Sequence, residues 1–252
     1  MSISQAIPQY RQVAETIRRR ILSGRYRQGE IIPPAADLEA AFKVSNITIR
    51  KALAILANEG WLSGRRGVGT IVTASPPDGR LAIAMSGNFR EWLESADGAS
   101  HPIDQQVLDI HTAPAPARVA RALGVADDHP LWCMRRLRRL DGAPISYHVN
   151  WGAPEQFAWI DADTMADNHS FVQLLRADGR LPLARMEQSV EAIVADRDLS
   201  DLLEIAFGEP LYFVENLYRG TNGRVVAVTH LYLRGDRYVY QASIALDDGD
   251  AP

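Results

Sequence analysis

The segment from Ser45 to Lys51 carries side chains suited to reading a nucleic acid. Ser45 can accept a hydrogen bond from the free backbone N–H groups of a following helical turn, so a helix is predicted to begin there. Apolar residues recur after it at helical spacing and predict a buried stripe. On the other side, Arg can pair with guanine, Asn with adenine, and an apolar side chain with the thymine methyl group. The expected DNA contacts on this helix are Ser45, Asn46, Ile47, Thr48, Arg50 and Lys51.

A glycine-rich hairpin is predicted directly after this helix. Residues 61–63 and 70–72 have the pattern of two short strands, joined by a turn over residues 64–69. Glycines permit the turn and a close approach of the backbone to another surface. Arg65 and Arg66, followed by Gly67, are expected to neutralise phosphates or enter a narrow minor groove. The alternative is a helical module with a solvated charged face, but a helix pair with this hairpin favours DNA binding.

Arg136 and Arg138 form the second group with possible chemistry. They are two residues apart on a predicted strand, so their side chains share a face among apolar neighbours, whereas Arg135 and Arg139 point to the other face. Two buried like charges cost several kcal/mol unless anions meet them. A carboxylate or phosphate ligand can do so through bidentate hydrogen bonds. Internal Asp or Glu residues are the alternative partners, and the sequence leaves both possibilities open.

Further candidates for this anion site come from neighbouring segments. Phe89 and Arg90 stand at a predicted helix start, where backbone N–H groups can bind an anion. His148 and Tyr232 lie on strands expected to flank the arginines, and Glu191 is a weaker candidate on another strand. A lone His or Tyr in a strand is more often a packed, hydrogen-bonded residue, so these positions remain hypotheses.

The elements that position these groups predict two domains joined by a linker. Residues 1–74 are expected to form the DNA-binding domain, with helices over residues 7–23 and 35–42 before the helix that starts after Ser45. The arginines at 18–20 either touch phosphates or form a solvated cluster. Residues 75–80, rich in Pro, Gly and Ser character, are the expected linker. Residues 81–247 alternate hairpin-linked strands with short helices, without an evident internal repeat, which predicts an α+β domain on a mostly antiparallel sheet with flanking helices. Helices are predicted over residues 115–123, 154–159, 170–177 and 199–206, with Gly124, Gly179 and Gly208 as terminators, and Asp141-Gly142 is predicted to be a hairpin turn.

Charge is distributed unevenly along the 252 residues. Residues 1–74 hold 11 Lys and Arg against 5 Asp and Glu, a net +6, so the remaining 16 against 26 give −10 for residues 75–252. This asymmetry is typical of a chain in which one half meets a polyanion. Neither a membrane-spanning apolar run nor a signal-peptide pattern is present, and the single cysteine, Cys133, fits a reducing compartment. We therefore expect a cytoplasmic protein without membrane contact.

Enzymatic function finds no support among the residues. The six histidines show no metal-ligand spacing with each other or with Cys133. The chain has no nucleophile elbow, no P-loop and no dinucleotide-binding glycine pattern. We expect no catalytic residues, no metal and no cofactor. The competing hypothesis, a lyase- or esterase-like enzyme with an incidental helical module, requires catalytic residues that the sequence does not offer.

The first 74 residues resemble the winged helix-turn-helix of the bacterial GntR family of transcriptional regulators. Two departures stand out: Pro33-Pro34-Ala35 replaces the usual Pro-Ser-Glu, and Asn46 replaces the usual Arg after the turn serine. Both regions normally face DNA, so the operator is expected to differ from common family sites. The matching residues are Gly24, Gly29, Glu30, Leu38, Phe42, Val44, Ser45, Thr48, Arg50, Ala52, Leu53, Leu56, Gly60, Gly67, Val68, Gly69 and Thr70.

Several short segments of the second half form an ordered pattern: residues 88–91, 136–138, 141–144, 208–211, 219, 222–223 and 234–238. On these segments the second half resembles the ligand-sensing (UTRA-type) domain of the HutC subfamily, whose fold is similar to chorismate lyase. The resemblance implies an effector domain that holds small acidic metabolites with arginines such as Arg136 and Arg138. It also favours a homodimeric repressor that leaves a palindromic double-stranded operator when the effector binds. His148 departs from the Glu often found there.

Overall fold

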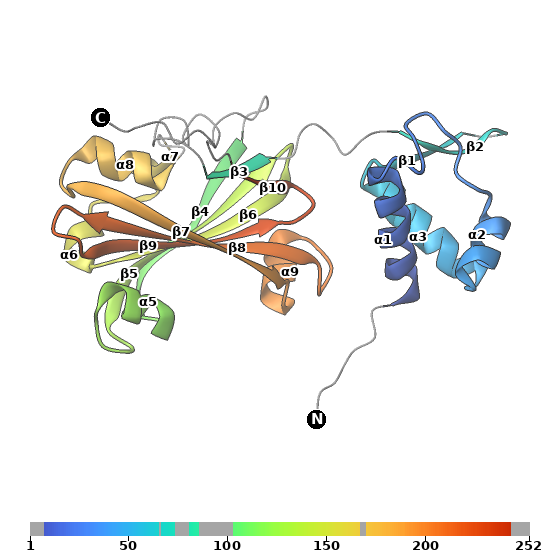
Figure 1. The fold of residues 1–252 in the computed structure, drawn as a ribbon. Helices are drawn as coiled ribbons and strands as arrows, with labels where there is room; N and C mark the ends of the chain where they lie inside the picture. Colours follow the sequence, from blue (N-terminus) through green and yellow to red (C-terminus); the bar gives the residue numbers. More distant parts are fainter. Residues whose placement is uncertain (1–7, 66, 74–80, 86–102, 167–169, 243–252) are drawn as a thin grey trace, which may run out of the picture. The chain divides into compact units, whose positions relative to one another are not determined.

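The computed structural model describes residues 8–65, 67–73, 81–85, 103–166 and 170–242 (Figure 1). The chain separates into two compact units, residues 1–80 and 81–252. The first contains the predicted helix pair and hairpin, and the second contains the predicted sheet. Within the described ranges, no helix is long and apolar enough to cross a membrane.

The first unit is a helix-turn-helix followed by a hairpin wing. Its core forms because Val13, Ile17 and Ile21, at helical spacing on the first helix, are buried together with Ile49 and Leu56 of the third helix. The wing strands pair antiparallel, as predicted, and the helices begin or end within two residues of their predicted limits. The elements are α1 (Gln9–Leu22), α2 (Ala35–Phe42), α3 (Asn46–Asn58), β1 (Leu62–Arg65) and β2 (Gly69–Val72).

The second unit is built on a six-stranded antiparallel sheet with the order β4-β5-β6-β9-β8-β7. The mostly antiparallel α+β prediction is confirmed. The sheet strands are β4 (Ile103–Pro114), β5 (Pro130–Leu140), β6 (Ala143–Gly152), β7 (Leu183–Val194), β8 (Pro210–Gly220) and β9 (Val225–Arg234). The helices are α5 (Ala117–Leu123), α6 (Pro154–Phe157), α7 (Ala162–Ala166), α8 (Phe171–Asp178) and α9 (Arg197–Leu203).

The sheet has an internal repeat of topology. The order strand, helix, hairpin occurs as β4-α5-β5-β6 and again as β7-α9-β8-β9, and the two halves join where β6 pairs with β9. The joined strands are the central pair, so the hairpins β5-β6 and β8-β9 meet in the middle of the sheet. The sequence showed no such repeat, because two segments with similar polar and apolar alternation can fold with the same topology without sharing the same residues.

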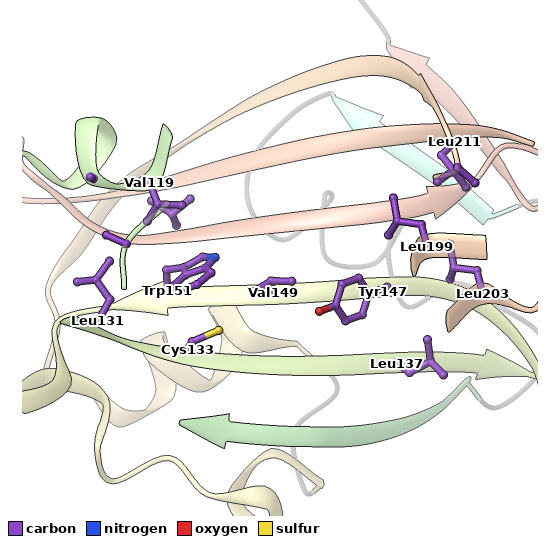
Figure 2. Packing of buried hydrophobic residues seen from close by; sticks show 14 residues of the cluster. Val119, Leu131, Cys133, Leu137, Tyr147, Val149, Trp151, Leu199, Leu203 and Leu211 are labelled. Atoms are coloured by element: carbon purple, nitrogen blue, oxygen red, sulfur yellow. The ribbon is translucent and has the colours of Figure 1, made fainter. Parts of the chain in front are cut away.

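One face of the sheet is closed by α5 and α9. Side chains from both helices pack on Cys133, Tyr147 and Trp151 in one apolar cluster (Figure 2). The helices contribute Val119 and Leu199, which lie against the central strands. Burial of this apolar area stabilises the domain and fixes which side of each strand faces the two helices.

The other face carries Arg136 and Arg138 and is called here the arginine face. Helices α6, α7 and α8 cover one part of it through a cluster that includes Trp132, Phe157 and Phe171. A separate parallel pair, β3 (Leu81–Met85) with β10 (Tyr238–Ala242), packs at another part through Ile83. The arginines, two residues apart on one strand, therefore share the face on which two separate apolar clusters form.

Three helix details differ from or refine the sequence predictions. The helix expected over residues 199–206 ends at Leu203 because Glu204 takes the left-handed conformation, with φ 53°, in place of the expected terminator Gly208. Gly124 and Gly179 end α5 and α8 in that conformation, as predicted. Helix α7 was not predicted, because a five-residue segment carries too little periodicity.

Candidate nucleic-acid interface and candidate anion site

The start of α3 is fixed by a serine cap. Lys43 ends α2 in the left-handed conformation, and the Ser45 side chain then accepts a hydrogen bond from the backbone N–H of Thr48 at 3.4 Å. The two hydroxyl groups of Ser45 and Thr48 also lie 3.0 Å apart. The cap sets the direction in which the first turn of α3 presents its side chains.

Three of the predicted DNA contacts are exposed on α3. Ile47 is 68% exposed, which is unusual for a large apolar side chain and fits a surface that meets a partner. Arg50 and Lys51 are also exposed, and the Lys51 ammonium group lies 5.9 Å from the ring centre of Tyr10 on α1. The buried stripe of α3 faces the core, so the structure leaves this polar side available.

Asn46, by contrast, is half-buried and already has a partner. Its amide nitrogen donates a hydrogen bond to the carboxylate of Glu39 on α2. The sequence offered no sign of this contact, because the two residues lie on different helices. At the wing, Arg65 is exposed and Gly67 has φ +77°, as the predicted tight turn requires, while Arg66 lies outside the described residues.

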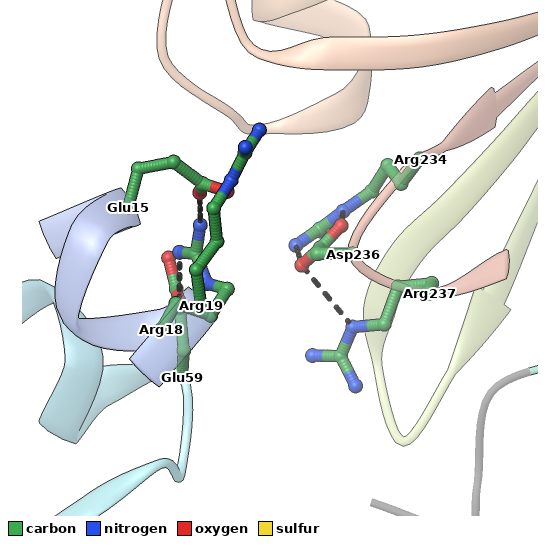
Figure 3. A network of polar contacts seen from close by, with 7 residues as sticks. All are labelled: Glu15, Arg18, Arg19, Glu59, Arg234, Asp236 and Arg237. Atoms are coloured by element: carbon green, nitrogen blue, oxygen red, sulfur yellow. Dashed lines mark hydrogen bonds and ion pairs between the residues drawn. The ribbon is translucent and has the colours of Figure 1, made fainter. Parts of the chain in front are cut away.

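The arginines of α1 have intramolecular partners. Arg18 forms ion pairs with Glu15 and with Glu59 at the end of α3, and Arg19 pairs with Glu15 at 3.3 Å (Figure 3). Arg20 lies over the ring of Phe42 at 4.9 Å. Arg18 therefore ties α1 to α3, an ion-pair role that neither predicted alternative, phosphate contact or a solvated cluster, described.

A second polar network, at the turn between β9 and β10, is also structural. Arg234 donates to Asp236 at 3.0 and 2.8 Å (Figure 3). It also donates to the backbone carbonyl of Pro144 at 2.8 Å. The latter bond ties this turn to the hairpin between β5 and β6. These hydrogen bonds give Arg234 a structural role at this turn.

Arg136 is the most deeply buried charge of the arginine face, with 2% of its surface exposed. Its guanidinium donates to Gln105 Oε1 on β4 at 2.7 Å and to Asn150 Oδ1 on β6 at 3.3 Å. Both acceptors are neutral amides, so they satisfy hydrogen bonds without compensating the positive charge. Arg138 follows two residues later, and its Nε atom is buried without a hydrogen-bond partner.

No carboxylate of the described residues forms an ion pair with Arg136 or Arg138. Desolvation, with repulsion from Arg138 as a smaller cause, lowers the pKa of Arg136 to about 9. Arg135 and Arg139, on the opposite face, instead have the partners Asp109 and Glu204, which confirms their predicted separation from the pair. Among the described residues, the alternative of internal acidic partners for Arg136 and Arg138 therefore finds no support.

His148 joins the arginines, as predicted. It pairs across the strands with Arg136, is 5% exposed, and its Nε2 atom lies 2.9 Å from the Ser146 hydroxyl group. Desolvation, followed by repulsion from Arg136 and Arg138, holds the pKa of His148 well below its usual range. The ring is therefore neutral near pH 7, and the site presents two positive charges together with neutral hydrogen-bonding groups.

A buried row of amide and hydroxyl groups extends this site across the sheet. Asn150 donates to the Thr229 hydroxyl group at 2.7 Å, and Gln188 donates to Asn216 at 2.8 Å. With Gln105, which also donates to the Met165 carbonyl group, polar groups on the arginine face are contributed by every strand of the sheet. These residues carry no local sequence signal, since single Asn, Gln or Thr residues in strands are common.

Two predicted effector residues, Glu191 and Tyr232, do not lie on the arginine face. Glu191 accepts a hydrogen bond from Arg118 of α5 at 2.7 Å, and Tyr232 stacks on Tyr147 with ring centres 5.8 Å apart. Both lie on the α5/α9 face, opposite His148 and Arg136, because side chains alternate along each strand and the register places them on the other side. Phe89 and Arg90 lie outside the described residues.

The remaining reactive groups have no catalytic arrangement. Burial raises the pKa of the Cys133 thiol to about 12, as expected for an unreactive core cysteine. Within the part of the chain that the structure describes, no three His, Cys, Asp or Glu residues gather into a possible metal site.

Comparison with known families assigns both units. The family description "Bacterial regulatory proteins, gntR family" matches residues 9–72, and "UTRA domain" matches residues 100–239. Fold and family together define a winged helix-turn-helix transcriptional regulator with a UTRA domain, and not an enzyme. The chain belongs to the GntR family, and its architecture fits the HutC-like subfamily.

Individual relatives agree with this assignment. The chain is 26% identical to the HTH-type transcriptional regulator Rv0792c of Mycobacterium tuberculosis, over 95% of this chain and 87% of that protein. It is 25% identical to the mannosyl-D-glycerate transport/metabolism system repressor MngR of Escherichia coli, over 92% and 94% respectively. The crystal structure of PhnF from Mycobacterium smegmatis shares the fold, with a TM-score of 0.56 and 20% identity over 93% of this chain and 100% of that one.

Proposed function

We propose that this chain is a repressor that leaves its operator when a small anionic metabolite binds the second unit. One observation carries the proposal: the buried Arg136 and the half-buried Arg138 share one face of the sheet without a carboxylate partner among the described residues. Such a site costs folding free energy unless an anion occupies it. This loss of folding free energy is explained if the uncompensated positive charge gives the site its affinity for an anionic ligand.

The first unit is proposed to bind double-stranded DNA as a homodimer in the cytoplasm. A palindromic operator matches a protein two-fold axis, and each α3 then enters one major-groove half-site. Arg50 is proposed to contact a base edge, and Arg65 a phosphate, because their side chains are exposed on the expected helix and wing. Ser45 and Thr48 are proposed to position the backbone at the DNA, with Asn46, Ile47, Lys51, Arg66 and Gly67 completing the contact set.

The effector is proposed to carry two negative charges or one phosphate. Arg136 and Arg138 supply two cations on one face, and planar guanidinium groups pair well with carboxylate or phosphate oxygens. His148 and Ser146 supply neutral hydrogen-bonding groups next to them. The name of MngR refers to mannosyl-D-glycerate, which contains a carboxylate, and this supports an acidic metabolite as the ligand class. The backbone near Phe89 and Arg90 is proposed to complete the site.

Coupling between the sites is proposed to act through residues 75–80, the linker between a DNA-binding domain of residues 1–74 and an effector domain of residues 81–247. A ligand that binds the DNA-free form more tightly must lower the affinity for DNA. By linkage, DNA lowers the affinity for the ligand by the same factor. The effector therefore changes the free-energy difference between the DNA-bound and DNA-free arrangements of the dimer.

Gel-shift experiments with DNA from upstream of the chain's own gene test this function. Wild-type protein should retard the DNA, and a phosphorylated or carboxylated metabolite should reverse the shift. Arg50→Ala should weaken retardation without ligand, whereas Arg136→Ala should retain it and lose the ligand response. Absence of DNA binding at low salt would refute the proposal, and tighter binding with ligand would indicate an activator.

A further inference from the structure

The contact between Asn46 and Glu39 determines which atoms Asn46 can offer to DNA. Asn46 is the first residue of α3, directly after the Ser45 cap, and Glu39 projects from the preceding helix. A carboxylate accepts hydrogen bonds and donates none, so the amide nitrogen of Asn46 must face Glu39. This removes the ambiguity between the oxygen and nitrogen of the amide and fixes its orientation.

One amide N–H and the amide oxygen of Asn46 remain unused by Glu39. An asparagine amide has two N–H donors and one carbonyl acceptor, and Glu39 takes one of the donors. When Glu39 accepts the N–H that points away from the amide oxygen, the remaining N–H and the oxygen lie side by side. Adenine presents the complementary pair in the major groove, an acceptor at N7 and a donor at N6, whereas guanine presents two acceptors, N7 and O6.

We infer that Asn46, oriented by Glu39, makes this regulator prefer adenine over guanine at the base that Asn46 faces. Opposite guanine, the Asn46 oxygen would meet O6 without a proton between them, which is repulsive. An arginine at position 46 would have the reverse preference, because its donors match both guanine acceptors. Ile47, exposed at the next position, is suited to a thymine methyl group, so an A·T-rich half-site fits both side chains.

Glu39 acts in this scheme as a positioning residue. Its carboxylate is half-buried between α2 and α3, and it bonds Asn46 in the absence of DNA. A fixed amide loses less conformational freedom on binding and cannot rotate to offer two donors to guanine. The inference rests on the proposed DNA-binding function and adds the chemistry of one operator position.

Selection of bound duplexes from a randomised DNA pool, with the full-length chain, tests the inference. Wild-type protein should enrich adenine over guanine by roughly tenfold at one position of each half-site. Asn46→Arg should reverse the preference to guanine at that position and leave the other positions unchanged. Asn46→Ala should remove the preference there, and Glu39→Ala should reduce it.

Controls separate this inference from the proposed function and from misfolding. Arg65→Ala should weaken binding to all sequences alike, without changing the preference at any position. Thermal unfolding of each variant should match that of the wild type. If Asn46→Arg is unstable, Asn46→Ala still tests the inference. Specific binding with no change in base preference in the Asn46 variants would overturn the inference alone. Failure of the wild type to bind any duplex would overturn the proposed function as well.

Discussion

Arg136→Met is predicted to stabilise the ligand-free protein, although it removes two hydrogen bonds. In the native state, the hydrogen-bond partners of this guanidinium among the described residues are neutral amides, and the positive charge of Arg138 lies nearby. Methionine has a similar length, no charge and enough flexibility to fill the same space among apolar neighbours. Replacement of a poorly compensated buried charge by an apolar side chain is therefore expected to be favourable.

The magnitude follows from two opposing contributions. A pKa lowered from 12.5 to about 9 corresponds, at about 1.4 kcal/mol for each pH unit, to roughly 5 kcal/mol against the charged form. Removing the donor leaves the oxygens of Asn150 and Gln105 without it, which costs about 1–3 kcal/mol for each group that stays unsatisfied. One unsatisfied oxygen leaves a net gain of about 2–4 kcal/mol, and two leave a net change between about −1 and +3 kcal/mol, so a gain is expected unless both penalties are large. For a domain of this size, each kcal/mol raises Tm by about 2–4 °C.

Thermal and urea unfolding in phosphate-free buffer measure this difference. Arg135→Met is the matched control, because this neighbouring arginine is exposed on the opposite side of the strand and pairs with Asp109. The control should be neutral or slightly destabilising, by up to about 1 kcal/mol. Addition of inorganic phosphate should stabilise the wild type and leave Arg136→Met unaffected. If Arg136→Met lowers the stability by more than 1 kcal/mol, the arginine has a compensating partner and the anion site as described does not exist.

Three further outcomes are expected. Arg50→Ala should lose about 1–3 kcal/mol of operator binding and relax specificity at one base pair, measured by anisotropy with single-base operator variants, and a uniform loss over all sequences would contradict the assignment. Arg65→Ala should lower the slope of binding affinity against salt concentration by about one, and an unchanged slope would exclude a phosphate contact. Because the pKa of His148 is lowered in the folded state, the unfolded chain binds more protons below about pH 6.5, and the free energy of unfolding falls as the pH decreases. His148→Asn should make this decrease smaller in urea titrations between pH 7 and 5.

Local patterns predicted the elements that are strongly periodic or sharply bounded. The Ser45 cap, the strands of the hairpin around Asp141-Gly142 and the helix stop at Gly124 all depend on a few adjacent residues. The end of α9 at Glu204 was missed because a glutamate rarely adopts positive φ, so its sequence position gives no sign of a helix stop. The repeated half-sheet topology depends on pairing between distant strands, for which the sequence has no local sign.

The anion site was predicted in part, because adjacent residues on one strand carry a local signal and residues on distant strands do not. Arg136 and Arg138 are near one another in sequence, so strand alternation alone placed them on one face. Glu191 and Tyr232 required the register of separate strands, and their assignment to that face was wrong. Asn150, which bonds Arg136 from the adjacent strand, carried no signal of its own.

Communication between the two units is tested most directly by measuring DNA affinity and effector affinity on the same preparation. Fluorescence anisotropy with an operator duplex gives the first, with and without saturating effector, and calorimetry gives the second, with and without operator. In the wild type, we predict that effector lowers the operator affinity by the same factor by which operator lowers the effector affinity. Arg136→Met should bind the operator with wild-type affinity, and added effector should leave that affinity unchanged. An effector that binds through Arg136 yet leaves the operator affinity unchanged would contradict the proposed repressor.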